Sequence, residues 1–133
     1  MNDEEKKRAF FAAAPHAVVG ASRDRSKYGN KVLRAFLQND RIVFAVNPMA
    51  DEVEGLKSYP DLASLPEPVY GVSIVTPPHV TETIIEQAAL LGVKNIWLQP
   101  GAESEEAVHR ATQFGMNVIS GGPCILVALR YRE

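Results

Sequence analysis

A buried strand, a turn of small residues and a helix follow one another between His16 and Asn39, and this order constrains the fold more than any other feature. The apolar run Ala17-Val18-Val19 ends in Gly20-Ala21-Ser22, and a helical pattern begins after Tyr28-Gly29. The apolar residues of that helix share one face, at Val32, Leu33, Phe36 and Leu37. Because the start of a helix presents unpaired N–H groups and the positive end of the helix dipole, the stretch predicts an anion-binding loop.

Basic residues are concentrated in the same loop. Arg23, Arg25, Lys27 and Lys31 fall within nine positions, whereas the whole chain of 133 residues has 14 lysines and arginines. This local excess favours a ligand with several phosphate groups, and an ordinary solvated surface is the alternative. We expect Arg23 and Lys27 to contact the ligand and Arg25 to point toward solvent.

Short apolar runs alternate with helical patterns along the rest of the chain. Four more strands are predicted, at residues 42–46, 70–75, 95–98 and 117–120, and a leading helix over residues 3–14 precedes the first strand. Between residues 49 and 69 we expect an irregular crossover with one helical turn capped by Asp61. The last long helix is capped by Ser104 and carries inward-facing apolar residues at Val108, Ala111 and Phe114.

Strands that alternate with helices form a parallel, doubly wound α/β sheet. Right-handed crossovers place the first strand centrally, with the second on one side and the third on the other. The predicted fold is a single Rossmann-like sheet of five or six strands with helices on both faces. Its order is 3-2-1-4-5, or a near relative if residues 49–69 add a short strand. One domain over residues 1–133, with residues 1–14 as its leading helix, is expected.

The composition of the chain limits the kinds of ligand it can bind and the cell compartment in which it is expected. The chain is 46% hydrophobic, and its net charge of −2 argues against nucleic-acid binding, which needs a broad positive face. Cys124 is the only cysteine, so disulfides within the chain and cysteine-rich metal sites are excluded, and a cytoplasmic location is expected. The only apolar run near the N-terminus, residues 9–14, is too short for a signal peptide or a membrane span.

The predicted carboxyl ends of the strands carry small, polar or proline residues. These are Gly20-Ala21-Ser22, Asn47-Pro48, Thr76-Pro77-Pro78 and Gln99-Pro100-Gly101. Ligands of doubly wound sheets bind beyond this edge, at the point where the strand order reverses. We therefore expect the binding site there.

Two features of the sequence argue against a site for NAD. No G-x-G-x-x-G motif follows Gly20, since the next glycine is Gly29. The second strand ends in Asn47-Pro48, where an NAD site usually presents a carboxylate to the ribose hydroxyls. A ribose that carries a 3′-phosphate, as in coenzyme A (CoA), would be repelled by that carboxylate. The missing acid therefore favours CoA over NAD.

Five short motifs lie in order along the chain. They are Val19-Gly20-Ala21-Ser22, Lys27-Tyr28-Gly29-Asn30-Lys31-Val32, Val46-Asn47-Pro48, Gly55-Leu56-Lys57 and Ile96-Trp97-Leu98-Gln99-Pro100-Gly101. Together they resemble the small stand-alone CoA-binding domain proteins, which are similar to the CoA-binding domain of the succinyl-CoA synthetase alpha subunit. The resemblance covers residues 14–124 and implies a Rossmann-type domain that holds CoA.

The resemblance also implies roles for individual positions. The pyrophosphate would lie on Gly20, Ala21, Ser22 and Arg23, with Lys27 on a phosphate. The adenosine end would lie against Asn47 and Pro48, and the pantetheine arm would follow Thr76, Pro77 and Pro78. The family often has lysine after Asn-Pro, where this chain has Met49, so Lys27 or Lys57 would have to serve the 3′-phosphate.

Three further residues each allow two interpretations. Tyr28 either stacks on adenine or packs over the loop, and Gln99 either contacts the ligand or ties neighbouring loops together. Cys124 is either a small buried residue or close enough to the ligand thiol to form a mixed disulfide under oxidation.

The function predicted from the sequence is non-catalytic binding of CoA or an acyl-CoA. No nucleophile–base pair and no cluster of metal ligands is recognisable, so neither a catalytic nor a metal site is predicted. One alternative is a ligase-like subunit that processes acyl-CoA together with another chain, and another is an NAD(H)-binding sensor. A homodimer or a protein partner is compatible with each of these.

Overall fold

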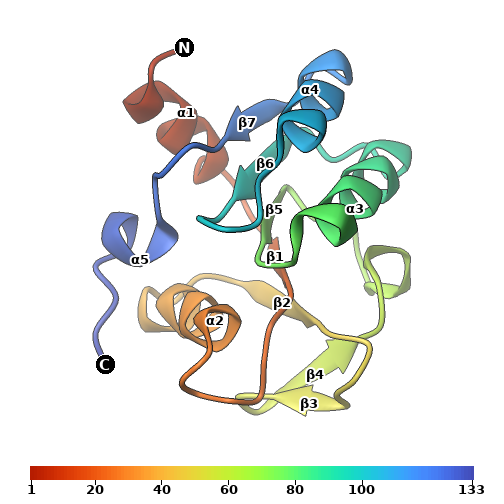
Figure 1. Ribbon diagram of the computed structural model, residues 1–133. Helices are drawn as coiled ribbons and strands as arrows, with labels where there is room; N and C mark the ends of the chain where they lie inside the picture. Colours follow the sequence, from red (N-terminus) through yellow and green to blue (C-terminus); the bar gives the residue numbers. More distant parts are fainter.

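A single seven-stranded sheet runs through the computed structural model, which describes residues 1–133 (Figure 1). The strands are β1 (His16–Val19), β2 (Val43–Val46), β3 (Glu52–Val53), β4 (Leu56–Tyr59), β5 (Gly71–Ile74), β6 (Asn95–Leu98) and β7 (Asn117–Ile119). The helices are α1 (Asp3–Phe10), α2 (Tyr28–Gln38), the short 3-10 helix η1 (Leu62–Ser64), α3 (Pro78–Leu90), α4 (Glu105–Gln113) and α5 (Ile125–Ala128).

The strand order is β3-β4-β2-β1-β5-β6-β7, and every neighbouring pair is parallel except β3 and β4. Numbered as the five predicted strands, the order from β2 to β7 is 2-1-3-4-5, which places the first strand between the second and the third as expected. The order 3-2-1-4-5 is obtained when β4, a short strand within residues 49–69, is counted as the third strand, and β7 then becomes a sixth. The Rossmann-like fold and the central position of β1 are thus confirmed. The order reverses between β1 and β5, which makes this point of the carboxyl edge the expected binding position.

The sheet has more strands than the five or six predicted, because residues 52–59 form a β-hairpin. Its two-residue turn consists of Glu54 (φ 50°) and Gly55 (φ 80°), the left-handed pair that joins tightly twisted antiparallel strands. The usual sequence signal for such a turn is Asn-Gly or Asp-Gly, so Glu-Gly in a proline-rich region did not reveal it. The helical turn after Asp61 is confirmed, since the Asp61 side chain accepts a hydrogen bond from the Ser64 amide at 2.9 Å.

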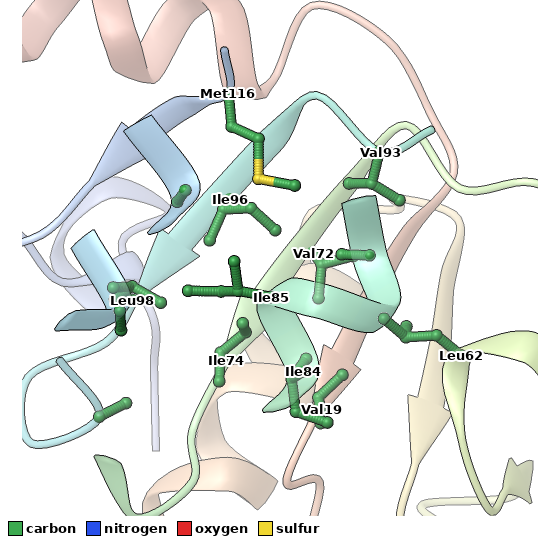
Figure 2. Close-up of a cluster of buried hydrophobic side chains, with 14 of the residues drawn as sticks. Val19, Leu62, Val72, Ile74, Ile84, Ile85, Val93, Ile96, Leu98 and Met116 are labelled. Carbon is green, nitrogen blue, oxygen red and sulfur yellow. The ribbon is translucent and has the colours of Figure 1, made fainter. Parts of the chain in front are cut away.

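Helices cover both faces of the sheet, with α3 and α4 on one face and α1, α2 and α5 on the other (Figure 1). All four residues of β1 are buried, which explains its continuous apolar sequence. Ala17 and Val19 pack toward α3, and Val18 packs toward α2. Figure 2 shows the α3 side of this core, where Val19 lies beside Ile84. No helix is both long and apolar enough to span a bilayer.

Several predicted boundaries are corrected by the structure. The leading helix ends at Phe10, and β1 runs from His16 to Val19, one residue earlier than predicted. The buried His16 explains the earlier start of the strand, because its Nε2 lies 2.7 Å from the carbonyl oxygen of Phe10 and ties α1 to the sheet. The Ser104 cap is confirmed, but Phe114 follows the last residue of α4 and is 41% exposed, so the prediction that it faces inward is wrong.

Candidate functional site

The loop between β1 and α2 can exist only because two glycines let backbone segments touch. Gly20 has φ +96°, and a Cβ atom built on it would lie 2.0 Å from the carbonyl oxygen of Val75. A Cβ atom on Gly29 would lie 1.9 Å from the carbonyl oxygen of Gly20. The first turn of α2 is therefore packed directly on the turn that ends β1. Gly29 belongs to one of the five motifs that carry the family resemblance, but its steric role was not predicted.

Amide and guanidinium side chains hold this loop in place through hydrogen bonds to its backbone carbonyl oxygens. The Nδ2 groups of Asn47 and Asn30 donate hydrogen bonds at 2.8 Å, to the carbonyl oxygens of Ala21 and Ser22 respectively. Arg34, which is 9% exposed, donates to the carbonyl oxygen of Arg25 at 2.9 Å. Asn47 thus shapes the loop in addition to lining the carboxyl edge. The parts played by Asn30 and Arg34 were missed, because they depend on contacts that only the folded chain makes.

The same loop leaves backbone donors free. The N–H groups of Ala21, Ser22 and Arg23 have no acceptor within the chain, and neither do those of Tyr28 and the next two residues of α2. Helix α2 has Lys27 as its N-cap residue, no capping side chain and no acidic residue in its first turn. An anion placed at this loop would meet both unpaired N–H groups and the positive end of the helix dipole.

The four basic residues of the loop region fall into two pairs with different surroundings. Arg25 forms an ion pair with Glu54 at 3.3 Å, and Lys31 forms one with Glu133 at 2.8 Å. Arg23 and Lys27 are exposed and make no ion pair. The positive charge available to a ligand therefore belongs to the two residues chosen from the sequence.

A cavity of about 250 Å³ opens beside the loop, between the ends of β1 and β2 and the first turns of α3. Six of the residues predicted for the site line it, namely Gly20, Ala21, Ser22, Asn47, Pro48 and Thr76. The rest of its lining is Val19, Val46, Pro60, Asp61, Val80, Ile84 and Gln87. Segments that are far apart in the sequence thus meet at the carboxyl edge.

Asp61 adds a carboxylate to the cavity that was not predicted from the sequence. The end of β2 is free of acid, as expected, but Asp61 reaches the same cavity from the loop after β4. Its Oδ1 caps η1 by accepting hydrogen bonds from the amide and the hydroxyl of Ser64, at 2.9 and 2.8 Å. Because a carboxylate is present after all, the acid-free end of β2 favours CoA over NAD less strongly than the sequence suggests.

Tyr28 and Gln99 lie outside the cavity and contact each other. The Tyr28 hydroxyl donates to Gln99 Oε1 at 3.2 Å and also contacts the thiol of Cys124. Burial, and secondarily the contact with Cys124, raises the pKa of Tyr28 well above its usual value, so this phenol is neutral at physiological pH. Gln99 is fully buried and also accepts from the amide of Ile125 at 3.1 Å. These contacts are those of residues that tie loops together, and a contact with a ligand stays a prediction.

The two prolines after Thr76 lie beyond the cavity. Pro77 lines a separate hollow of about 300 Å³ with residues 75–76 and 100–102, and Pro78 is the exposed first residue of α3. A path from the cavity along Thr76 thus leads to a second depression between the ends of β5 and β6. Another hollow of about 270 Å³ lies between the η1 region and the end of α3, and it contains none of the predicted site residues.

The fold and the site define a Rossmann-like domain with an open ligand cleft where the strand order reverses. The family model described as "CoA binding domain" matches residues 15–130. The chain therefore belongs to this family of CoA-binding domains. No group of three His, Cys, Asp or Glu side chains is placed to hold a metal ion.

Similar proteins include both small and large chains. A conserved hypothetical protein from Pyrococcus furiosus has 40% sequence identity and a TM-score of 0.82, and the match covers 87% of this chain and 99% of that one. The acetate–CoA ligase (ADP-forming) II subunit alpha of the same organism is 28% identical over 87% of this chain and 28% of its own length. The dinucleotide-forming acetyl-coenzyme A synthetase 1 of Ca. Korarchaeum cryptofilum, solved with phosphate and ADP, has 38% identity and a TM-score of 0.74 over 90% of this chain and 27% of that one. This chain thus spans less than a third of the two acyl-CoA-forming enzymes.

Proposed function

We propose that this protein binds CoA or an acyl-CoA at the carboxyl edge of its sheet, without catalysing a reaction by itself. The observation that carries the proposal is the loop between β1 and α2. It combines unpaired backbone N–H groups, an uncapped helix start and the two unpaired cations Arg23 and Lys27 in a member of a CoA-binding family. In the bound state the pyrophosphate lies on Gly20–Arg23 with Lys27 on a phosphate.

The remaining parts of the ligand follow the cleft in both directions. The adenosine end occupies the cavity beside Asn47 and Pro48, and the pantetheine arm runs past Thr76 toward the hollow at Pro77. Met49 is 89% exposed and offers no charge to the 3′-phosphate. Lys27 or the exposed Lys57 serves it instead.

Isothermal titration of the chain with CoA, dephospho-CoA and NAD tests this proposal. We expect CoA to bind, and dephospho-CoA to bind about tenfold more weakly, since a charge-assisted contact to the 3′-phosphate is lost. Lys27→Ala and Arg23→Ala should each weaken CoA binding about five- to tenfold. Arg25→Ala is the matched control, because Arg25 is already paired with Glu54. Equal affinities for CoA and dephospho-CoA, or tighter binding of NAD, would contradict the proposal.

A second candidate is a subunit that forms or consumes acyl-CoA together with another protein. It is favoured by the similarity to a ligase subunit of which this chain matches 28%. In that case the chain lends the CoA site and the partner supplies the nucleotide chemistry. Purification of the tagged chain from its native cells, followed by an assay for ATP-dependent or ADP-dependent acyl-CoA turnover in the purified fraction, distinguishes this candidate from a stand-alone binding module.

A further inference from the structure

One polar side chain in the cavity has no partner. Gln87 lines the cavity from α3, and its Oε1 atom is buried without any hydrogen bond. The rest of the Gln87 side chain makes no hydrogen bond within the chain either. Such a group is costly in a folded protein, since a buried acceptor without a donor has lost its water and gained nothing in return.

On α3 itself, Gln87 shares the cavity with apolar side chains. Val80, Ile84 and Gln87 follow one another on one face of α3, at the spacing that stacks side chains along a helix. Ile84 lies beside Val19 of β1, as Figure 2 shows, and both residues line the cavity. At about 250 Å³ the cavity is smaller than the sites that enclose whole drug-sized ligands. A cavity of this size takes one part of a ligand, such as a single ring system, and Gln87 offers that part a hydrogen-bond acceptor.

We infer that Gln87 is a specificity residue that accepts a hydrogen bond from the exocyclic amine of adenine. This inference rests on the proposed function, which places the adenosine end of CoA in this cavity. The last torsion of a glutamine side chain is soft, so the amide oxygen turns toward a bound base at little cost. A purine without the amine leaves the oxygen unpaired, and recognition of this kind discriminates strongly because the penalty falls on the wrong ligand.

The side-chain oxygens of Ser22, Asn47 and Thr76 also line the cavity, but each already takes part in a hydrogen bond within the chain. Asp61 is the one charged acceptor there and the natural competitor for this role. Its Oδ1 is already engaged with the amide and hydroxyl of Ser64, whereas the Gln87 oxygen is buried and free. An unpaired buried acceptor gains more from a donor than one that is partly exposed and already bonded. Gln87 is therefore the stronger candidate to recognise the amine.

The test compares CoA with an analogue in which a purine lacking the exocyclic amine replaces adenine. Titration calorimetry is carried out with the wild-type chain, with Gln87→Leu and with the more flexible Gln87→Met. We expect the wild type to bind CoA about tenfold more tightly than the analogue, and both variants to bind the two ligands equally. Because both substitutions remove a buried unpaired oxygen, both should also raise the melting temperature of the free protein.

Asp61→Asn is the matched control, since asparagine also caps a helix and leaves Gln87 in place. It should keep the preference for CoA over the analogue. The inference is overturned if the wild type binds both ligands equally, if the Gln87 variants keep the preference, or if Asp61→Asn abolishes it. If the wild type binds no CoA at all, the proposed function fails first, and the two failures are thereby distinguished.

Discussion

Helices α2 and α4 both follow a parallel strand at the carboxyl edge of the sheet, but they begin in opposite ways. At the start of α4, Ser104 accepts a hydrogen bond from the amide of Ala107 at 3.0 Å, and two acidic residues, Glu105 and Glu106, lie in the first turn. At the start of α2 no side chain caps the helix, no acid lies in the first turn, and the N-cap residue is Lys27. The chain therefore satisfies the start of α4 itself and leaves the start of α2 open to an external anion.

The difference shows that the start of α2, unlike that of α4, lowers the stability of the folded chain. The loop before α2 needs a left-handed Gly20 and the direct contact of Gly29 with it, and it is held in place by Asn30 and Asn47. A loop that served only to connect β1 with α2 would need neither this support nor its free donors. Local rules of helix formation are broken here and obeyed at α4, which is the pattern expected of a functional site.

Replacing Gly29 with alanine should have the largest effect, because it breaks the contact on which the α2 loop depends. The added methyl group would lie 1.9 Å from the carbonyl oxygen of Gly20, against backbone that cannot rotate away. We expect a loss of about 3 kcal/mol in the free energy of unfolding, measured in urea, as for other overpacked sites. CoA binding should fall at least about a hundredfold, since α2 and the turn that ends β1 would be pushed apart.

Gly115→Ala, at the end of α4, is the matched control for that prediction. Gly115 has φ +76°, but no atom lies within 4 Å of the position that an added methyl group would take. The cost is therefore only that of a left-handed alanine, about 1 to 2 kcal/mol. Its CoA affinity should equal that of the wild type. If Gly29→Ala folds and binds CoA normally, the close packing of α2 on the loop is not what forms the site.

Lys27→Asp converts the start of α2 into one that resembles α4. Lys27 has the extended backbone of an N-cap (φ −81°, ψ 148°), so an aspartate there would accept a hydrogen bond from the amide of Gly29 or Asn30. The free energy of unfolding should rise by about 1 kcal/mol. CoA affinity should fall about a hundredfold, because a cation is lost and a carboxylate occupies the donors meant for phosphate.

Lys27→Ala separates the two causes, since it removes the cation without adding a cap. It should lose less affinity than Lys27→Asp and gain no stability. Equal affinities of the two variants in calorimetry would mean that the free donors of α2 do not contribute to binding.

Much of the fold was predictable because it follows from local patterns. The buried strands are continuous apolar runs, such as Ala17-Val18-Val19, and right-handed crossovers then leave few possible orders. The caps at Asp61 and Ser104 were predictable for the same reason, as each acts within three residues. The hairpin of β3 and β4 was missed because Glu54 takes a left-handed conformation that cannot be predicted from its residue type.

The candidate site was predictable in outline and not in detail. Residues at strand ends, such as Gly20 and Asn47, are located by the topology alone. The hydrogen-bond partners of Asn30 lie 8 and 24 residues away in the sequence, and Asp61 reaches the cavity from another loop. Both features depend on how separate segments of the chain pack together. Gln87 resembles any surface residue of an amphipathic helix, and only the cavity beside it distinguishes it.

Ser104→Ala should have the smallest effect and completes the comparison from the side of α4. The variant loses the hydrogen bond that Ser104 accepts from the Ala107 amide at 3.0 Å and the one that its hydroxyl donates to Glu82 at 2.8 Å. We expect the free energy of unfolding to fall by about 1 kcal/mol in urea titration, as for other N-cap serines. CoA affinity should stay within twofold of the wild-type value, which corresponds to a change of roughly 0.4 kcal/mol in the free energy of binding. A larger loss of affinity would mean that the start of α4 also belongs to the binding site, and that its cap does more than complete the helix.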